Sequence, residues 1–343
     1  MRQAAALPDR APAPRPPGLA EVNSLVPGLV SALTAGAEGG PVRREAALDL
    51  LRRHLGASRD SVQTAFEARE LSGLAAARWL SAHTDGLMQA IHAYALAMVP
   101  PEVRAPPEPP FALVATGGYG RGVLAPFSDI DLLFLTDAAA GKRAERLVEF
   151  VLYLLWDLGL KVGHATRGIR ECMAEADRDA SVLTALVDAR FLVGEREVFD
   201  RFRAVFDRTR RERGLGPFLA AKRAERAARH ARYGDSPYMV EPHVKEGRGG
   251  LRDLQTLYWL ARYAFGTERM PELVGPDSPG GGLLIEQEAR AIRRAWNFLW
   301  TVRFHLHYVA GRAEERLTFD FQPVVGARMG YAPRGRQDGV ERF

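Results

Sequence analysis

Residues 115–135 read Ala115-Thr-Gly-Gly-Tyr-Gly-Arg-Gly-Val-Leu-Ala-Pro-Phe-Ser-Asp-Ile-Asp-Leu-Leu-Phe-Leu135. The stretch follows an apolar run that begins at Phe111 and leads into a second one, so we expect two buried strands joined by a glycine-rich turn. Gly117 and Gly118 end the first strand. Because glycine lets a backbone approach a ligand closely, their N–H groups can point at a phosphate.

Two acidic residues head the second expected strand, which runs from Asp129 to Thr136. Side chains two residues apart on a strand share a face, so Asp129 and Asp131 should project together. Two neighbouring carboxylates repel each other unless a cation lies between them. Mg²⁺ prefers oxygen ligands and shares its coordination sphere with substrate phosphates. The pattern therefore predicts that Asp129 and Asp131 hold Mg²⁺ beside a phosphate-binding turn.

The order of these features is more specific than any one of them. The segment Gly-Gly-Tyr-Gly-Arg-Gly does not fit the dinucleotide pattern G-x-G-x-x-G, and no G-x-x-x-x-G-K-[ST] loop is present. A glycine pair alone or an Asp-x-Asp pair alone is common. Here Gly118 lies eleven positions before Asp129, between two apolar runs. The alternative is a glycine hairpin with a solvated acidic cap.

In this order the segment resembles the nucleotidyltransferase superfamily of the DNA polymerase beta type. More narrowly, GGYGRG followed by SDIDLL is similar to bacterial PII uridylyltransferase/uridylyl-removing enzymes. A second block, Glu241-Pro-His-Val-Lys-Glu-Gly-Arg-Gly-Gly-Leu-Arg-Asp-Leu-Gln255, resembles the EPxxKEGxGGLRDxQ signature of that family, and Arg303-Phe-His-Leu-His307 is a third match. The resemblance runs from about Leu50 to the last residue. It implies transfer of UMP from UTP to a tyrosine of the PII nitrogen-signalling protein, with release of pyrophosphate.

Five further residues are candidates for contacts with the nucleotide. Lys245, Arg248 and Arg252 lie among glycines in the second block and can bind phosphate oxygens. The alternative for this block is a brace between domains, with Arg252 held in ion pairs. Arg121 follows the glycine turn and can bind a phosphate or pair with an acid. Ser128 can donate to a phosphate or simply form the turn before the aspartates.

One departure from the wider superfamily concerns the third carboxylate, which that superfamily usually supplies from the next strand. We expect that strand at Lys161 to Arg167, and it contains no acid. Water or a residue from elsewhere, with Glu241 as one candidate, would then complete the metal site.

The fold class expected is α+β, with a small mixed β-sheet and its helices as a nucleotidyltransferase core, flanked by N-terminal helices and a C-terminal helical domain. The expected parts are a flexible leader rich in Pro and Ala (1–41), an N-terminal helical segment (42–105), the core (106–210) and a helical domain (211–343). Helices are expected at 143–158, 179–194, 197–210, 217–233, 251–265 and 284–309. Prolines between 100 and 110 indicate a linker.

Composition limits the class of protein further. The 343 residues include one cysteine, Cys172, which excludes a disulfide framework and favours a reducing cytoplasm. No apolar run is long enough to span a membrane. The formal charge is +5, and residues 208–232 contain nine Arg or Lys against two acids. This basic cluster fits a phosphate or an acidic partner, and equally a solvated helix face.

The same resemblance implies that full enzymes carry an HD hydrolase domain and ACT domains. The chain contains no His-Asp dipeptide, so we expect it to be truncated before the HD domain and to transfer UMP without removing it. An adenylyltransferase acting on glutamine synthetase or a related protein is the closest alternative. A non-catalytic module that binds nucleic acid is a second one, although we expect neither nucleic acid nor a membrane as a partner.

Overall fold

The computed structural model describes residues 25–36, 40–98, 110–137, 141–234, 236, 238–267, 270–278, 280 and 282–343. The first 24 residues of the expected leader lie outside this range, and so does almost all of the expected proline-rich linker. No described helix is both long and apolar enough to cross a membrane.

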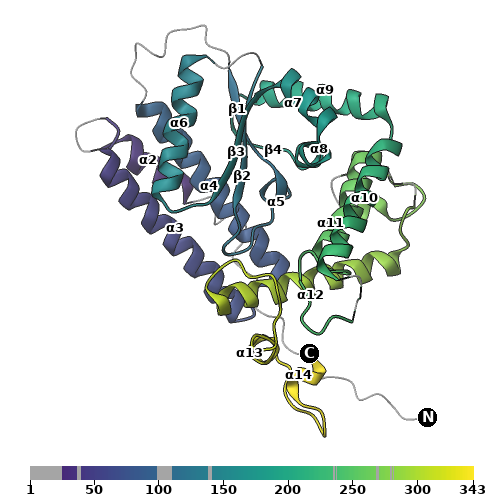
Figure 1. The fold of residues 1–343 in the computed structure, drawn as a ribbon. Coiled ribbons are helices and arrows are strands. Elements are labelled where there is room, and N and C mark those ends of the chain that lie inside the picture. The colour runs from purple at the N-terminus through teal and green to yellow at the C-terminus, as the bar shows by residue number, and fades with distance from the viewer. Residues whose placement is uncertain are drawn as a thin grey trace.

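A four-stranded mixed sheet forms the centre of the molecule (Figure 1). Its strands are β1 (Phe111–Ala115), β2 (Ile130–Thr136), β3 (Val162–Gly168) and β4 (Arg190–Gly194), in the spatial order β3-β2-β1-β4. β1 runs antiparallel to both β2 and β4, whereas β2 and β3 are parallel. β3 therefore lies at one edge of the sheet, directly beside the strand that carries Asp131.

The central strands are apolar on both faces because helices cover both faces. Leu113 and Phe134 belong to one buried cluster, while Val114 and Leu133 belong to another on the opposite side. This two-sided burial explains why β1 and β2 read as continuous apolar runs in the sequence.

The two layers of helices come from different parts of the chain (Figure 1). Helices α4 (Gly73–Met98) and α6 (Lys142–Asp157) pack on the first face. Helices α7 (Ile169–Arg178), α8 (Ala180–Val187) and α9 (Arg196–Arg213) pack on the second. The connection from β2 through α6 to β3 is the crossover that parallel strands require.

The N-terminal helices are α2 (Val26–Thr34) and α3 (Arg44–Glu67). α2 lies within residues 1–41, where we expected only a flexible leader, so that expectation was wrong for this part. Leu29 and Leu33 of α2 are buried in the first cluster. This burial stabilises a helix that the sequence pattern of so short a segment did not predict.

The C-terminal part is helical, as expected. It contains α10 (Gly216–Tyr233), α11 (Leu251–Phe265), η2 (Met270–Leu273), α12 (Glu286–Ala310), α13 (Gln322–Arg328) and α14 (Gly339–Arg342). α12 runs beneath the core and joins the N-terminal helices to α10 and α11 (Figure 1). At this junction the side chains of Asn297 and Thr301 accept hydrogen bonds from the N–H groups of Leu74 and Gly73. The described architecture confirms the α+β fold class.

Three local expectations were wrong. The stretch 179–194 is helix α8 followed by strand β4, not one helix. The glycine turn is a short helix, α5 (Gly117–Gly120). β2 begins at Ile130, so Asp129 lies just before the strand.

Candidate active site

A cavity of about 360 Å³ lies between the core and the C-terminal helices. Eight of the nine residues proposed from the sequence line it: Gly117, Gly118, Arg121, Ser128, Asp129, Asp131, Lys245 and Arg252. Arg248 is the exception. It is exposed and lines a separate, mostly apolar cavity with residues such as Phe298 and Val302.

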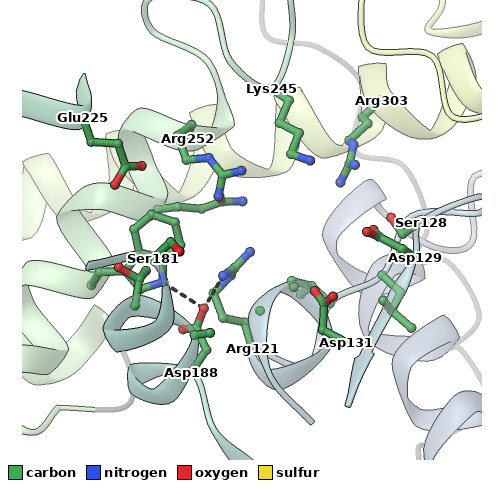
Figure 2. Close-up of a pocket in the computed structure, with 18 of the residues that line it drawn as sticks. Arg121, Ser128, Asp129, Asp131, Ser181, Asp188, Glu225, Lys245, Arg252 and Arg303 are labelled. Atoms are coloured by element: carbon green, nitrogen blue, oxygen red, sulfur yellow. Dashed lines mark hydrogen bonds and ion pairs between the residues drawn. The ribbon is translucent and has the colours of Figure 1, made fainter. Parts of the chain in front are cut away.

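The two carboxylates reach the cavity from different backbone settings. Asp131 is the second residue of β2, whereas Asp129 lies in the loop before it. The expected strand therefore began one residue too early, at Asp129 instead of Ile130. Both side chains nevertheless line the same side of the cavity, close to Ser128 (Figure 2).

Two glycines make room for the carboxylate of Asp131. A Cβ atom added to Gly117 would lie 2.5 Å from Oδ2 of Asp131, and one added to Gly163 would lie 2.6 Å from Oδ1. Gly117 also has φ of +57°, which disfavours other residues. Gly163 is the direct partner of Asp131 in the parallel pairing of β2 with β3. Each oxygen of Asp131 therefore lies in a space that a side chain at a neighbouring position would fill.

The surroundings of Asp131 raise the free-energy cost of its negative charge. Burial raises the pKa of Asp131, and the negative charge of Asp129 raises it further. The positive charges of Arg121 and Lys245 oppose these effects only in part. Two close carboxylates whose repulsion is not fully compensated suit a divalent cation, so the residues present fit a bound divalent metal ion.

Helix α5 brings backbone amides to the same place. It follows β1 directly, and its carbonyl acceptors at Thr116 and Gly117 bind the N–H groups of Gly120 and Arg121. The N–H groups of Gly117 and Gly118 belong to the first turn, where a helix has no acceptor of its own for them.

Arg121 is held by a buried acid that the sequence analysis did not identify. Its guanidinium pairs with Asp188 at the end of α8. Asp188 also accepts a hydrogen bond from Trp259 Nε1 at 2.9 Å. The side chains of Arg121 and Asp188 are 9% and 1% exposed. The pairing of Arg121 with an acid, one of the two alternatives, is therefore present, and its guanidinium still points into the cavity (Figure 2).

The second sequence block forms the opposite wall. Arg252 donates to Glu246 at 2.9 and 3.3 Å and to Gln255 at 3.0 Å. Asp253, next to it, accepts from Arg229 of α10 at 2.6 Å. Arg252 and Asp253 are therefore held in ion pairs, as the alternative for this block predicted, but these pairs lie within the C-terminal helical part and do not join two domains. Arg252 also lines the cavity.

Lys245 and Arg303 point from this wall toward the two aspartates (Figure 2). Arg303, on α12, donates from Nε to both oxygens of Glu315 at 2.9 and 3.0 Å. Burial by itself raises the pKa of Glu315, but His307 and Arg303 beside the carboxylate lower it to about 2. Burial, followed by the charge of Arg303, lowers the pKa of Lys245. A phosphate would relieve this crowding of positive charge.

Ser128 forms the turn before the aspartates. Its Oγ accepts a hydrogen bond from the N–H of Ala125 at 3.2 Å, which is the turn-forming role described above. Glu241 does not line the cavity, and its Oε1 accepts from the N–H of Phe319 at 2.9 Å. Among the described residues, no group of three or more His, Cys, Asp or Glu side chains is placed to hold a metal.

The sequence analysis did not identify several of the residues that line the cavity. Besides Asp188 and Arg303 they include Ser181, Thr184, Lys222, Glu225, Gln255 and Trp259. Lys222 could have been identified from the sequence, because it lies in the basic cluster at residues 208–232. Its side chain is only 2% exposed, pairs with Glu225, and has its ammonium 4.9 Å from the Trp259 ring. That part of the cluster is therefore not a solvated helix face.

Comparisons with known proteins match both parts of the chain that line the cavity. Residues 102–188 match the family described as "Nucleotidyltransferase domain", a family that generally uses a divalent metal. Residues 217–343 match the family described as "GlnD PII-uridylyltransferase". The two matches cover the two walls of the cavity.

Curated relatives cover nearly all of the chain. A protein named bifunctional uridylyltransferase/uridylyl-removing enzyme from Gluconobacter oxydans is 50% identical over 92% of this chain and 34% of its own length. Proteins of the same name from Azospirillum brasilense and Rhodospirillum rubrum are each 45% identical, over 89% and 88% of this chain and 32% of their own lengths. The chain thus spans about a third of the length of these relatives. These matches show that the chain is similar to PII-uridylyltransferases over nearly its whole length.

Proposed function

We propose that this chain is a Mg²⁺-dependent uridylyltransferase that moves UMP from UTP to a tyrosine of a PII signalling protein and releases pyrophosphate. The observation that carries the proposal is the arrangement of charge across the cavity. Asp129 and Asp131 lie on one side, and Lys245 and Arg303 point toward them from the other (Figure 2). A bound triphosphate needs positive charge on both sides of the cavity. On the side of the two aspartates, a metal ion bound by their carboxylates would supply it.

Each group of residues has a separate task in this proposal. The N–H groups of Gly117 and Gly118 bind phosphate oxygens, and Arg121 adds a fixed positive charge beside them. Lys245 and Arg303 hold the β- and γ-phosphates, which become the pyrophosphate. Because Glu315 fixes the Arg303 guanidinium, this charge is oriented before the substrate binds.

Asp129 and Asp131 are the residues that would hold Mg²⁺. When bound, the metal neutralises charge on the phosphates and favours departure of pyrophosphate. The two glycines at 117 and 163 keep both oxygens of Asp131 open to ligands.

The base would lie in the part of the cavity away from the aspartates. This part is lined by Ser181 and Glu225 (Figure 2), together with Gln255 and the ring of Trp259. It offers amide and carboxylate groups beside an aromatic face, which suits a planar base with donors and acceptors at its edge. We place the protein in the cytoplasm, where the unpaired and buried Cys172 remains reduced.

The direct test replaces both carboxylates. Asp129→Ala with Asp131→Ala should abolish transfer of labelled UMP to a PII protein, while the circular dichroism spectrum and the melting temperature stay close to those of the wild type. Unchanged transfer by this variant would refute the assignment of the two aspartates.

A second test addresses the substrate. The wild-type chain is incubated with Mg²⁺, a PII protein and each of the four nucleoside triphosphates, and the acceptor is examined by intact mass. Addition of UMP from UTP alone supports the proposal. Preferential use of ATP would indicate an adenylyltransferase, and salt-dependent binding to nucleic acid without turnover would indicate a binding module.

A further inference from the structure

A second cavity, of about 270 Å³, opens on the β3 side of Asp131. It shares Gly117, Asp131 and Ala185 with the first cavity. Its remaining walls come mainly from β3 and α8, with Ala165 and Val182 among them. The two cavities therefore meet at the carboxylate that we assign to the metal.

The two cavities differ in chemistry. The first contains five Lys or Arg side chains, namely Arg121, Lys222, Lys245, Arg252 and Arg303. In the second, the ionisable lining residues are Arg167, Asp131 and His164, and most of the other walls are apolar. A triphosphate belongs in the first cavity, whereas the second suits a mostly apolar side chain that carries one polar group.

The position of Asp131 relates the two cavities to the reaction. Oδ2 of Asp131 lies against Gly117, which lines both cavities, and Oδ1 lies against Gly163, which lines the second one. In phosphoryl and nucleotidyl transfer, the attacking and leaving oxygens lie roughly in line on opposite sides of the phosphorus. Because Lys245 and Arg303 hold the leaving pyrophosphate on one side, the attacking group must come from the other.

We propose that the second cavity binds the acceptor side chain, a phenol, and delivers its oxygen to the α-phosphorus beside Asp131. This inference rests on the proposed function and assigns the acceptor site within it. The phenol oxygen forms a bond to the α-phosphorus as the bond to the oxygen bridging the α- and β-phosphates breaks. The bonding electrons leave with pyrophosphate, and the phenol proton is released to water.

Two features make this cavity accessible to a protein acceptor. β3 is the edge strand of the sheet, so an approaching segment meets no further strand among the described residues. Such an edge can receive an extended segment by backbone pairing. The guanidinium of Arg167, which is half-buried at the cavity, can also lie against an aromatic ring and stabilise it there.

The experiment fills the cavity without touching the nucleotide side. Ala165 lines only the second cavity, so Ala165→Trp should lower kcat/KM for the PII acceptor by at least about tenfold, while the Kd for UTP with Mg²⁺ stays within about twofold. Arg167→Ala is the smaller perturbation and should raise KM for the acceptor about threefold. Arg170→Ala is its matched control, since Arg170 is exposed on α7 and lies outside the cavity.

The outcomes separate this inference from the proposed function. If the wild-type chain transfers UMP and both variants bind UTP normally but modify the acceptor poorly, the acceptor site is supported. If Ala165→Trp and Arg167→Ala modify PII as fast as the wild type, the acceptor site is wrong and the proposed function stands. If the wild type transfers no UMP to PII, the acceptor site and the proposed function are both wrong. Should Ala165→Trp not fold, as shown by loss of UTP binding, Arg167→Ala against Arg170→Ala decides the question.

Discussion

Adding one methyl group at Gly163 should impair the metal site that we propose while leaving every charged residue in place. The new Cβ would lie 2.6 Å from Oδ1 of Asp131, and ordinary van der Waals contact begins near 3.4 Å. The carboxylate must therefore move by about 0.8 Å, or β3 must shift away from β2 by a similar amount. Gly163→Ala is thus a geometric perturbation of Asp131 with no change in charge.

The expected size of the effect follows from this displacement. A misplacement of about 1 Å at a reacting centre can cost about a hundredfold in rate. We expect UMP transfer by Gly163→Ala to fall by about 30- to 100-fold, which corresponds to about 2–3 kcal/mol in activation free energy. Because Gly163 is exposed on the edge strand and its φ is ordinary, the fold should be retained.

The assay measures transfer of UMP to PII by intact mass across a titration of Mg²⁺. Gly163→Ala should need more Mg²⁺ for half-maximal rate than the wild type, since its carboxylate is displaced. Gly56→Ala is the control, because a Cβ at Gly56 meets no atom within 4 Å. It adds the same methyl group inside α3 and should leave the rate and the Mg²⁺ dependence unchanged.

One result would refute the reasoning. If Gly163→Ala transfers UMP at the wild-type rate with the wild-type Mg²⁺ dependence, then the position of Asp131 against β3 does not matter for catalysis. A fall in rate accompanied by loss of UTP binding and of the folded circular dichroism spectrum would instead show that the variant is unfolded. Measurement of the melting temperature therefore accompanies the titration.

Three further outcomes are expected. Asp188→Ala leaves the guanidinium of Arg121 buried without its partner, so the free energy of unfolding in urea should fall by about 3–5 kcal/mol; a loss below about 1 kcal/mol, typical of an exposed pair, would contradict this. Lys245→Met should raise the KM for UTP by about tenfold or more, as expected for loss of a charged hydrogen bond to phosphate, and an unchanged KM would place the phosphates elsewhere. Acid should destabilise the fold through three histidines whose pKa falls from 6.5 to about 4, mainly through burial: His83, His92 and His305. Below pH 6.5 the unfolded chain binds protons that the folded chain excludes, so stability declines toward pH 4 by up to about 1.4 kcal/mol per pH unit for each histidine; urea unfolding at several pH values measures this, and a flat profile would contradict it.

The parts of the fold that the sequence predicted are those with a local signal. β1 and β2 are continuous apolar runs with glycines between them, and α11 begins directly after a glycine pair and ends at the expected residue. The same glycines indicated a phosphate-binding site at the turn between these strands, and the cavity lies there. β4 was missed because the short run Arg190–Gly194 follows α8 without a glycine or proline, and a short apolar run does not distinguish strand from helix.

The residues that were missed depend on contacts between distant parts of the chain. Asp188 is 67 residues from Arg121 and 71 from Trp259 in the sequence, and only their packing makes it a buried acceptor. Arg303 belongs to a block that resembles the family, but its orientation depends on Glu315, which lies beyond the end of α12. No periodicity within a single element could have identified either residue as part of the cavity.

The absence of an acid at position 163 of β3 has a structural explanation. The parallel register places Gly163 directly beside Asp131, and any side chain there would start 2.6 Å from Oδ1. An aspartate at position 163 would therefore displace the very carboxylate that it should assist. With two carboxylates, a bound Mg²⁺ would keep coordination positions for water and for phosphate oxygens, which is how this ion is commonly bound in proteins. Gly163 instead lines the second cavity, where we propose that the acceptor side chain binds.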